Sequence, residues 1–221
     1  MLGIIFTGGH APDTQIIKHI IEKDVKKDDK TLFIAADSGL LTALSAEIKP
    51  DWIIGDMDSL GDTSLLSSFP SESVICHEQN KDYSDTELAF SLAIEKNCDD
   101  VWIIGGGGGR IDHLFGIRSL MERNIFPNRW ITDTADIHCI EADKEQSDSK
   151  KYYFNSKKEA VVSVFPLGES LWDAKSEGLK WTLDELSWDR GFYGLSNVAV
   201  EGDFSITVLL GRFMVILPFN K

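Results

Sequence analysis

Cysteine is scarce in this chain of 221 residues and shows no paired arrangement. The three cysteines, Cys76, Cys98 and Cys139, are widely spaced and form no CxxC motif. An odd number of isolated cysteines favours neither a disulfide framework nor a thiolate zinc site. The sequence therefore predicts a protein of a reducing compartment, the cytoplasm.

Long hydrophobic runs and an excess of basic residues are missing as well. The first apolar run, Leu2 to Phe6, is too short for a signal peptide or a membrane span. Lysine and arginine number 22 against 36 aspartates and glutamates, so the formal net charge is -14. Because nucleic acids are bound mainly through basic side chains, we expect neither a nucleic acid nor a membrane as partner. The acidity gives weak support to metal ions and cationic ligands.

Hydrophobic residues make up 43% of the chain, enough to build a buried core. Up to residue 142, short apolar runs alternate with stretches of helical periodicity, a pattern typical of βαβ units. The expected strands are Leu2 to Phe6, Leu32 to Ala36, Trp52 to Gly55, Ser73 to Cys76, Val101 to Gly105 and Trp130 to Thr134. The pattern predicts an α/β fold with a mostly parallel sheet and helices on both faces.

The composition changes at residues 143–151, which contain no apolar residue. We interpret them as a linker between a first domain, 1–142, and a second, 152–221. The second part alternates like strands, and Gly211 between two apolar runs predicts a hairpin turn. Because a part of about 70 residues forms only a marginal core, it should lean on the first domain or on a second subunit.

Carboxylates follow several of the predicted strands. Asp37 comes after the second strand, Asp56 and Asp58 after the third, and Asp82 and Asp85 after the fourth. Ligands of open parallel sheets bind beyond the carboxyl ends of the strands, so these side chains should gather at one edge. Mg²⁺ prefers such hard oxygen ligands, with Asp56 and Asp58 as first candidates. A lone DxD is more often an acidic turn, and it is the convergence of strand ends that favours a metal site.

The segment KDYSDTEL also has a structural interpretation. Ser84 and Glu87 have the spacing of a capping box, which explains both residues without any ligand. Asp85 in the first helical turn would interact favourably with the helix dipole. Asp82 is thus the acid that helix formation explains least.

Five consecutive glycines, residues 105–109, follow the fifth predicted strand and precede a helix expected from Ile111. Their N–H groups could approach phosphate oxygens, and Arg110 could add a planar charge. Arg110 replaces the third glycine of GxGxxG and no GK[ST] follows, which disfavours nicotinamide and Walker-type sites. A bare glycine run is more often a flexible turn, but Asp112 and His113 directly after it favour a phosphate site.

Three tryptophans, Trp172, Trp181 and Trp188, lie close together in the second part, before Ser196 and Asn197. Each tryptophan suits a β-domain core about as well as a binding surface. An exposed indole face would suit a flat cationic ring.

Taken together, ADSGL, GDMDS, KDYSDTEL, GGGGRIDH, GLKW and the SN pair resemble the thiamine pyrophosphokinase family. Each motif is weak alone, whereas their order and spacing from Ala36 to about Val215 are specific. The resemblance implies a Rossmann-like catalytic domain, a small thiamine-binding β-sandwich, and a homodimer with active sites at its interface. The implied reaction transfers the β,γ-pyrophosphoryl group of ATP to the thiamine hydroxyl, with Mg²⁺ as cofactor, giving thiamine diphosphate and AMP.

The resemblance also implies roles for single residues. Asp56, Asp58 and Asp85 would hold Mg²⁺, and Arg110 and Asp112 would act at the triphosphate. The expected nucleotide-binding residues are Asp37, Lys81, Asp82, Ser84, Gly107, Gly108, Gly109 and His113. The expected thiamine-binding residues are Trp181, lent by the partner subunit, with Ser196 and Asn197.

The chain departs from the family pattern at a few positions. Ile117 stands where bacterial members tend to carry Asn, and Val198 where an acidic residue often follows the SN pair. The first change would remove a hydrogen bond from the site, and the second would alter contacts with thiamine. Ser84 in place of Thr keeps the hydroxyl.

Two other functions use the same residues. A DxD at a strand end can hold the diphosphate of a nucleotide sugar, as in metal-dependent glycosyltransferases, although no acceptor domain is evident. A non-catalytic sensor could bind thiamine or a nucleotide and signal through its dimer.

Overall fold

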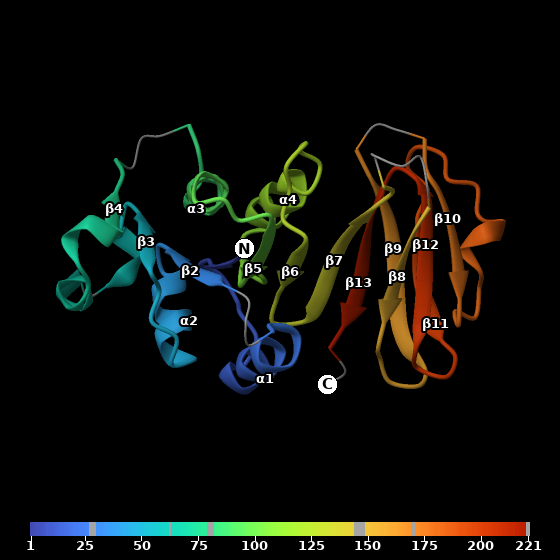
Figure 1. Ribbon diagram of the computed structural model, residues 1–221, viewed down its shortest axis with the longest axis horizontal. Helices are drawn as coiled ribbons and strands as arrows, with labels where there is room; N and C mark the ends of the chain where they lie inside the picture. The colour runs from blue at the N-terminus through green and yellow to red at the C-terminus, as the bar shows by residue number, and fades with distance from the viewer. Residues whose placement is uncertain (27–29, 62, 79–81, 144–148, 169–170, 220–221) are drawn as a thin grey trace. The chain divides into compact units, whose positions relative to one another are not determined.

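The computed structural model describes residues 1–26, 30–61, 63–78, 82–143, 149–168 and 171–219. The chain divides into two compact units (Figure 1). Unit 1 contains residues 1–120 and 125–134, and unit 2 contains residues 121–124 and 135–221. Within the described residues, no helix has both the length and the apolar character needed to cross a membrane.

Unit 1 is built on a parallel sheet. Its strands follow the order β4-β3-β2-β1-β5-β6, and each neighbouring pair in this series is parallel. The bounds are β1 Leu2–Phe6, β2 Thr31–Ala36, β3 Trp52–Gly55, β4 Val74–Cys76, β5 Asp100–Ile104 and β6 Arg129–Ile131. The strands predicted for this part of the sequence are confirmed, with small shifts at their ends. β1 is buried over its whole length, as its unbroken apolar run requires.

Helices connect these strands. They are α1 Thr14–Asp24, α2 Gly39–Ser45, α3 Asp85–Glu95 and α4 Ile111–Leu120, with short 3-10 helices η1 Asp58–Leu60, η2 Thr63–Ser68 and η3 Ser71–Ser73. α2 packs against β1 and β2, and α3 against β1, β2 and β3. Helical cover on both faces of the sheet stays a prediction.

The start of α3 confirms the capping box. The Ser84 hydroxyl accepts a hydrogen bond from the Glu87 N–H at 3.3 Å, and the Glu87 carboxylate accepts one from the Ser84 N–H at 2.9 Å. Two backbone N–H groups at the helix start are therefore satisfied by side chains. This fixes the place where Asp85 enters the helix.

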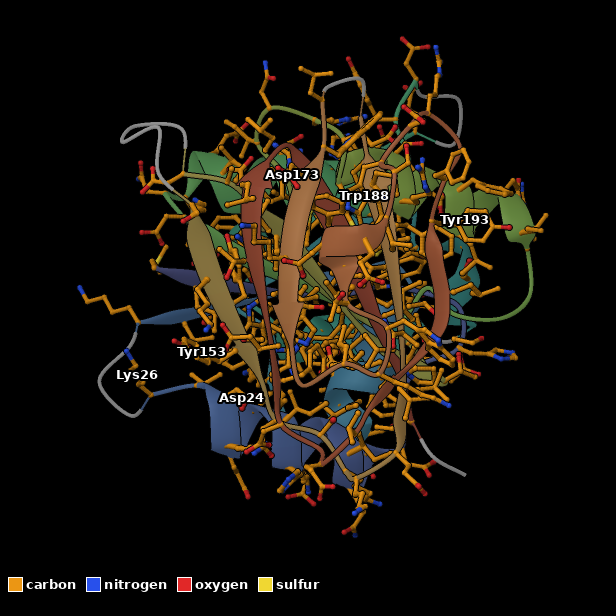
Figure 2. All side chains as sticks on the ribbon, turned by 90° about the vertical axis from the view of Figure 1, so that its right-hand side faces the viewer. Asp24, Lys26, Tyr153, Asp173, Trp188 and Tyr193 are labelled. Carbon is orange, nitrogen blue, oxygen red and sulfur yellow. The ribbon has the colours of Figure 1, made fainter. Side chains whose placement is uncertain are left out.

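Unit 2 contains two antiparallel sheets. β11, β9, β13 and β7 pair in that order, and β10, β12 and β8 form the separate three-stranded sheet. The bounds are β7 Ala135–Glu141, β8 Lys150–Phe154, β9 Ala160–Leu167, β10 Asp173–Glu177, β11 Gly194–Ala199, β12 Phe204–Leu210 and β13 Arg212–Pro218, with a 3-10 helix η4 at Leu183–Glu185. Side chains from both sheets share one apolar cluster, in which Ile206, Val208 and Phe213 are fully buried. Figure 2 shows the side chains of this unit, with Trp188 and Tyr193 labelled.

The hairpin predicted at Gly211 is wrong. β12 pairs with β10 and β8, whereas β13 pairs with β7 and β9, so the two strands belong to different sheets. Gly211, with a φ of 76°, takes the chain from one sheet to the other. A glycine between two apolar runs is equally compatible with a hairpin and with a sheet switch, because both need a sharp turn with positive φ.

The division between the units lies one strand earlier than the predicted domain boundary at residue 142. β7 pairs antiparallel with β13 and belongs to unit 2. Its apolar sequence resembles that of the preceding parallel strands, so only the pairing partner reveals its place. Of the predicted linker 143–151, residues 144–148 lie outside the described residues, and β8 already begins at Lys150.

Candidate functional site

Three carboxylates converge at one end of the parallel sheet in unit 1. Asp37 follows β2, Asp56 follows β3, and Asp85 is the first residue of α3. One carboxylate oxygen from each lies within 4.8 Å of those of the other two. β2 and β3 are parallel neighbours, so their carboxyl ends release Asp37 and Asp56 side by side. We call these three residues the acidic cluster.

The backbone around the acidic cluster adopts conformations that few residues tolerate. Asp37 has a φ of 50°, which places it in the left-handed region. Gly55 has a φ of 150°, and a Cβ there would lie 3.1 Å from Asp85 Oδ1 and 3.2 Å from Asp37 Cβ. A side chain at position 55 would therefore press the carboxylates apart. Glycine at the end of β3 is a condition for their close approach.

The donor set of the acidic cluster fits a hard divalent cation. All three carboxylates are half-buried, and Asp37 Oδ1 is buried without a hydrogen-bond partner among the described residues. A buried unpartnered carboxylate oxygen is costly unless a cation or water completes it. Mg²⁺ combines a small number of carboxylates with water and phosphate oxygens.

Asp58 lies outside the acidic cluster. Its side chain is exposed, and its backbone N–H donates to Asp56 Oδ1 at 3.1 Å. Met57 between them has a φ of 64°, so the two aspartates of the DxD motif diverge within a tight turn. Asp58 as a metal ligand stays a prediction. Asp37, expected at this sheet edge but assigned by the resemblance to the nucleotide, belongs to the cluster.

The segment before α3 supplies exposed polar groups. Asp82 and Ser84 are exposed. The Ser84 hydroxyl is engaged by Glu87, both as acceptor in the capping box and as donor to the Glu87 carboxylate at 2.9 Å. Lys81 lies outside the described residues.

The glycine run follows β5 and is partly occupied by its own hydrogen bonds. The N–H groups of Gly105, Gly106 and Gly107 donate to the backbone carbonyls of Ile131, Gly8 and His10 at 2.9, 2.8 and 2.9 Å. These hydrogen bonds connect the loop to β6 and to the residues that follow β1, and they hold the loop in place. Gly108 and Gly109, both exposed with φ near 60°, present the accessible part of the loop.

Gly107 has a steric role. It is buried, and a Cβ there would lie 2.2 Å from Asp133 Oδ1. Its N–H is directed at His10 and is not available to a phosphate. The prediction that Gly107 contacts the nucleotide can hold only for its other backbone atoms.

A cavity of about 140 Å³ lies beside the loop, between the ends of β1 and β5 and the starts of α3 and α4. It is lined by Thr7, Gly8, Ser84, Thr86, Glu87, Gly106, Asp112, His113, Gly116, Ile117 and Leu120. The structure thus brings the predicted residues Ser84, Asp112 and His113 together. Ile117, the departure from the family pattern, lies on the wall of the same cavity.

Thr7 and Thr86 are cavity residues that the sequence analysis missed. Their hydroxyls are 2.6 Å apart and share a hydrogen bond. Thr7 directly follows β1, so the strand-end rule that selected Asp37 and Asp56 also applies to it. Nothing in the sequence marks Thr86 as a site residue, because a threonine in the first turn of a helix is common.

Arg110 and Asp112 pair with each other at the start of α4. Arg110 Nε donates to Asp112 Oδ1 at 3.1 Å, and its Nη2 makes a second contact with Oδ2. Both side chains are mostly exposed, at 72% and 59%. The hydrogen bond from the guanidinium lowers the pKa of Asp112 and, in turn, raises the pKa of Arg110. The arginine is fully charged but engaged, and an incoming anion has to share or displace its partner.

In unit 2 the three tryptophans have different environments. Trp172 and Trp188 are half-buried against the apolar cluster, and Trp188 meets Phe213 edge to face at 4.9 Å. Trp181 is 54% exposed, and Lys180 Nζ lies 4.6 Å from its ring centroid. Trp181 therefore presents an accessible indole ring, which the other two do not.

Asn197 holds the backbone that carries Trp181. Its Oδ1 accepts from the Trp181 N–H at 3.1 Å, and its Nδ2 donates to the Trp181 carbonyl at 2.6 Å. Asn197 is only 5% exposed, so its amide is directed inward. Ser196 is exposed with a φ of 58°, and its N–H donates to Ser163 Oγ at 3.1 Å. The geometry makes Asn197 a positioning residue for Trp181.

Known proteins share this sequence and fold. Residues 25–132 match a family model described as thiamin pyrophosphokinase, catalytic domain. A thiamine pyrophosphokinase of Bacillus subtilis (strain 168) is 30% identical over 166 residues, which cover 71% of this chain and 72% of that protein.

Solved structures with the same fold include thiamine pyrophosphokinases from Bacillus subtilis (TM-score 0.76, 23% identity) and Geobacillus thermodenitrificans (TM-score 0.74, 24% identity), each covering 100% of this chain and 99% of the other. The thiamin pyrophosphokinase from Candida albicans has a TM-score of 0.67 at 14% identity and covers 99% of this chain and 89% of its own. At these identities the structural likeness concerns the fold alone. By its sequence relationship, the chain belongs to the thiamine pyrophosphokinase family and is an enzyme of that type.

Proposed function

We propose that this enzyme transfers the β,γ-pyrophosphoryl group of ATP to the hydroxyl of thiamine. The thiamine oxygen forms a bond to the β-phosphorus, the bond to the oxygen bridging the α- and β-phosphates breaks, and the hydroxyl proton is released. Thiamine diphosphate and AMP are the products. The observation that carries the proposal is the acidic cluster, built at the sheet edge of a chain that belongs to this family.

Asp37, Asp56 and Asp85 would hold Mg²⁺. When bound, Mg²⁺ would neutralise phosphate charge and orient the triphosphate. The protein's own contribution is preorganisation, because Gly55 and the left-handed Asp37 keep the three carboxylates close together before any ligand arrives.

The triphosphate would lie along the glycine loop. Gly108 and Gly109 leave their backbone accessible, and Arg110 can place a planar charge against phosphate oxygens. Asp112 would orient the guanidinium until the triphosphate takes its place. Contacts of the nucleotide with Lys81, Asp82, Ser84, Gly107 and His113 stay predictions.

Thiamine would stack on Trp181. Its flat rings and positive charge match an exposed indole face in an acidic protein. Ser196 is exposed and available to bind it, while Asn197 acts by fixing Trp181. Following the family resemblance, we also propose a cytoplasmic homodimer in which the partner subunit lends Trp181.

The direct test is AMP release from ATP and Mg²⁺ by the purified protein, with and without thiamine, with the new product identified by mass. Thiamine-dependent AMP together with thiamine diphosphate is the expected result. AMP without thiamine would reopen the identity of the acceptor, and preferential binding of UDP-sugars over ATP would support a glycosyltransferase instead. Ligand binding without any turnover would indicate a sensor.

Metal binding has an independent test. Titration of Mg²⁺ should raise the melting temperature of the wild type by mass action on the folded state. The variant Asp37→Asn should lose most of this shift while its circular dichroism stays unchanged. An equal shift in both proteins would place the ion elsewhere.

A further inference from the structure

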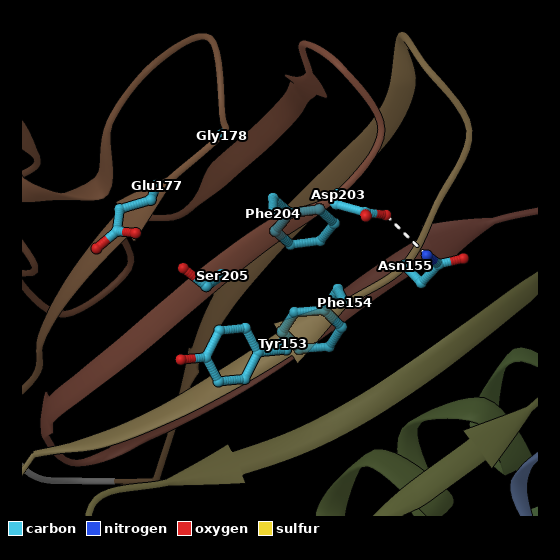
Figure 3. A pocket seen from close by; sticks show the side chains of 8 residues that line it. All are labelled: Tyr153, Phe154, Asn155, Glu177, Gly178, Asp203, Phe204 and Ser205. Atoms are coloured by element: carbon cyan, nitrogen blue, oxygen red, sulfur yellow. Dashed lines mark hydrogen bonds between the residues drawn. The ribbon is translucent and has the colours of Figure 1, made fainter.

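A groove of about 390 Å³ lies on the three-stranded sheet of unit 2 (Figure 3). It is formed at β8, at β12 and at the end of β10, and it shares no residue with Trp181, Ser196 or Asn197. We call it the sheet groove. The proposed reaction makes no use of it.

Strand register places one row of side chains across the sheet groove. Ser205 on the central strand β12 is opposite Tyr153 on β8 and opposite Glu177 on β10. Side chains directly opposite each other in antiparallel strands project from the same face of the sheet. Tyr153 is 78% exposed and Ser205 only 5%, so the tyrosine ring stands as a wall above a polar floor.

Carboxylates stand at both ends of the sheet groove. Figure 3 shows Glu177 at one end and the hydrogen-bonded pair of Asp203 and Asn155 at the other. Asn155 Nδ2 donates to Asp203 Oδ1 at 2.8 Å. The two ends carry negative charge, with an aromatic ring between them.

The ammonium group of Lys151 already lies at the Glu177 end of the sheet groove. Lys151 Nζ lies 2.8 Å from Glu177 Oε1 and 5.5 Å from the centroid of the Tyr153 ring. A carboxylate and a ring face thus meet one cation, the combination by which proteins recognise organic ammonium ions. The hydrogen bond to Glu177 also raises the pKa of Lys151, because it stabilises the charged ammonium form.

We propose that the sheet groove binds a small aliphatic ammonium compound, with one ammonium near Asp203 and a second competing with Lys151 for Glu177 and Tyr153. Lys151 is a tethered competitor, because its exposed ion pair with Glu177 is worth little and exchanges readily. Two carboxylates on a chain of net charge -14 favour a cation over a neutral hydroxyl compound of the same size.

The probe is 1,4-diaminobutane, titrated calorimetrically into the full-length protein, with 1,4-butanediol as a neutral compound of the same length. Lys151→Met removes the competitor and should tighten diamine binding about fivefold, the effect of roughly one exposed charge contact. Lys150→Met is the matched control, because Lys150 lies over the Tyr152 ring on the other face of β8, whereas Lys151 contacts Glu177 and Tyr153. It should leave binding unchanged.

Glu177→Gln and Asp203→Asn should each weaken the diamine about fivefold or more. Glu177 is largely exposed, so Glu177→Gln leaves the fold intact, and the melting temperature verifies this for both variants. Equal binding of the diol would overturn the proposed ligand class. Absence of diamine binding by the wild type, or equal effects of Lys151→Met and Lys150→Met, would overturn the site. Thiamine-dependent AMP release is measured separately, so failure of either proposal leaves the other standing.

Discussion

The acidic cluster in unit 1 and Trp181 in unit 2 are positioned by different means. The carboxylates are set by the backbone, through two parallel strand ends, a helix start and the close approach that Gly55 permits. The indole is set by one side chain, the buried amide of Asn197. The acidic cluster therefore depends on backbone conformation and on glycine at position 55, whereas the position of the indole depends on one side chain that a single substitution removes.

The largest effect should come from the acidic cluster. Asp37→Asn and Asp56→Asn each remove a carboxylate charge from a preorganised site, and we expect kcat to fall about 100-fold or more. AMP release at saturating Mg²⁺ measures the change, and the melting temperature shows that the variants remain folded.

Asp58→Asn is the matched control for this prediction. It alters the exposed neighbour that lies outside the cluster, and its effect should stay below about tenfold. A loss as large as that of Asp56→Asn would instead support the prediction that Asp58 also holds Mg²⁺.

Trp181 and Trp188 should respond differently to truncation, because one ring is exposed and the other is packed against Phe213. Trp181→Ala removes an exposed ring and should raise the KM for thiamine about tenfold, with little change in the KM for ATP or in stability. Trp188→Ala removes a ring packed on Phe213 and should lower the free energy of unfolding by about 3 kcal/mol. Steady-state kinetics and urea unfolding separate the two. Equal rises in both KM values for Trp181→Ala would contradict its assignment to thiamine.

Asn197→Ala tests whether a side chain holds Trp181 in place. The change leaves the N–H and carbonyl of Trp181 without their partner, and it should cost about 2 kcal/mol of stability. The KM for thiamine should rise even though the ring is still present. Ser196→Ala, at the exposed neighbour, is the control for stability and should change the unfolding free energy by less than about 0.5 kcal/mol. Unchanged thiamine binding in Asn197→Ala would show that the ring finds its place without the amide.

The smallest effect concerns Arg110 and Asp112. The guanidinium holds the pKa of Asp112 below its ordinary value, so the carboxylate stays charged, and the pair persists, as the pH falls through the ordinary range of aspartate. Any contribution of the pair to stability is present at pH values above the ordinary pKa of aspartate. It is lost only as the pH falls through the lowered pKa of Asp112. NMR titration of the Asp112 carboxyl carbon should show this midpoint, and Arg110→Gln should return it upward. An unchanged midpoint in Arg110→Gln would mean that the pairing does not persist in solution.

Some features of the candidate site are predictable from the sequence, and others are not. Asp56, Asp85 and the glycine run can be selected from the sequence, because each comes after a predicted strand and this order is visible along the chain. Asp37 was assigned to the nucleotide, and its place in the cluster depends on the pairing of β2 with β3. Asn197 is expected at thiamine from the family resemblance, and the sequence does not show that its amide is directed inward to the backbone of Trp181. The same limit produced the error at Gly211.

The parallel strands, the capping box at Ser84 and the polar residues that end these strands are predictable from the sequence alone. Those features depend on local periodicity, on short spacings and on chain direction. Tertiary contacts are needed to know which carboxylates meet, which tryptophan is exposed, which glycine N–H groups are engaged and to which sheet β13 belongs. Each of these features depends on residues that are far apart in the chain. A pattern of apolar and polar residues indicates that a side chain is buried or paired, but it does not identify the partner.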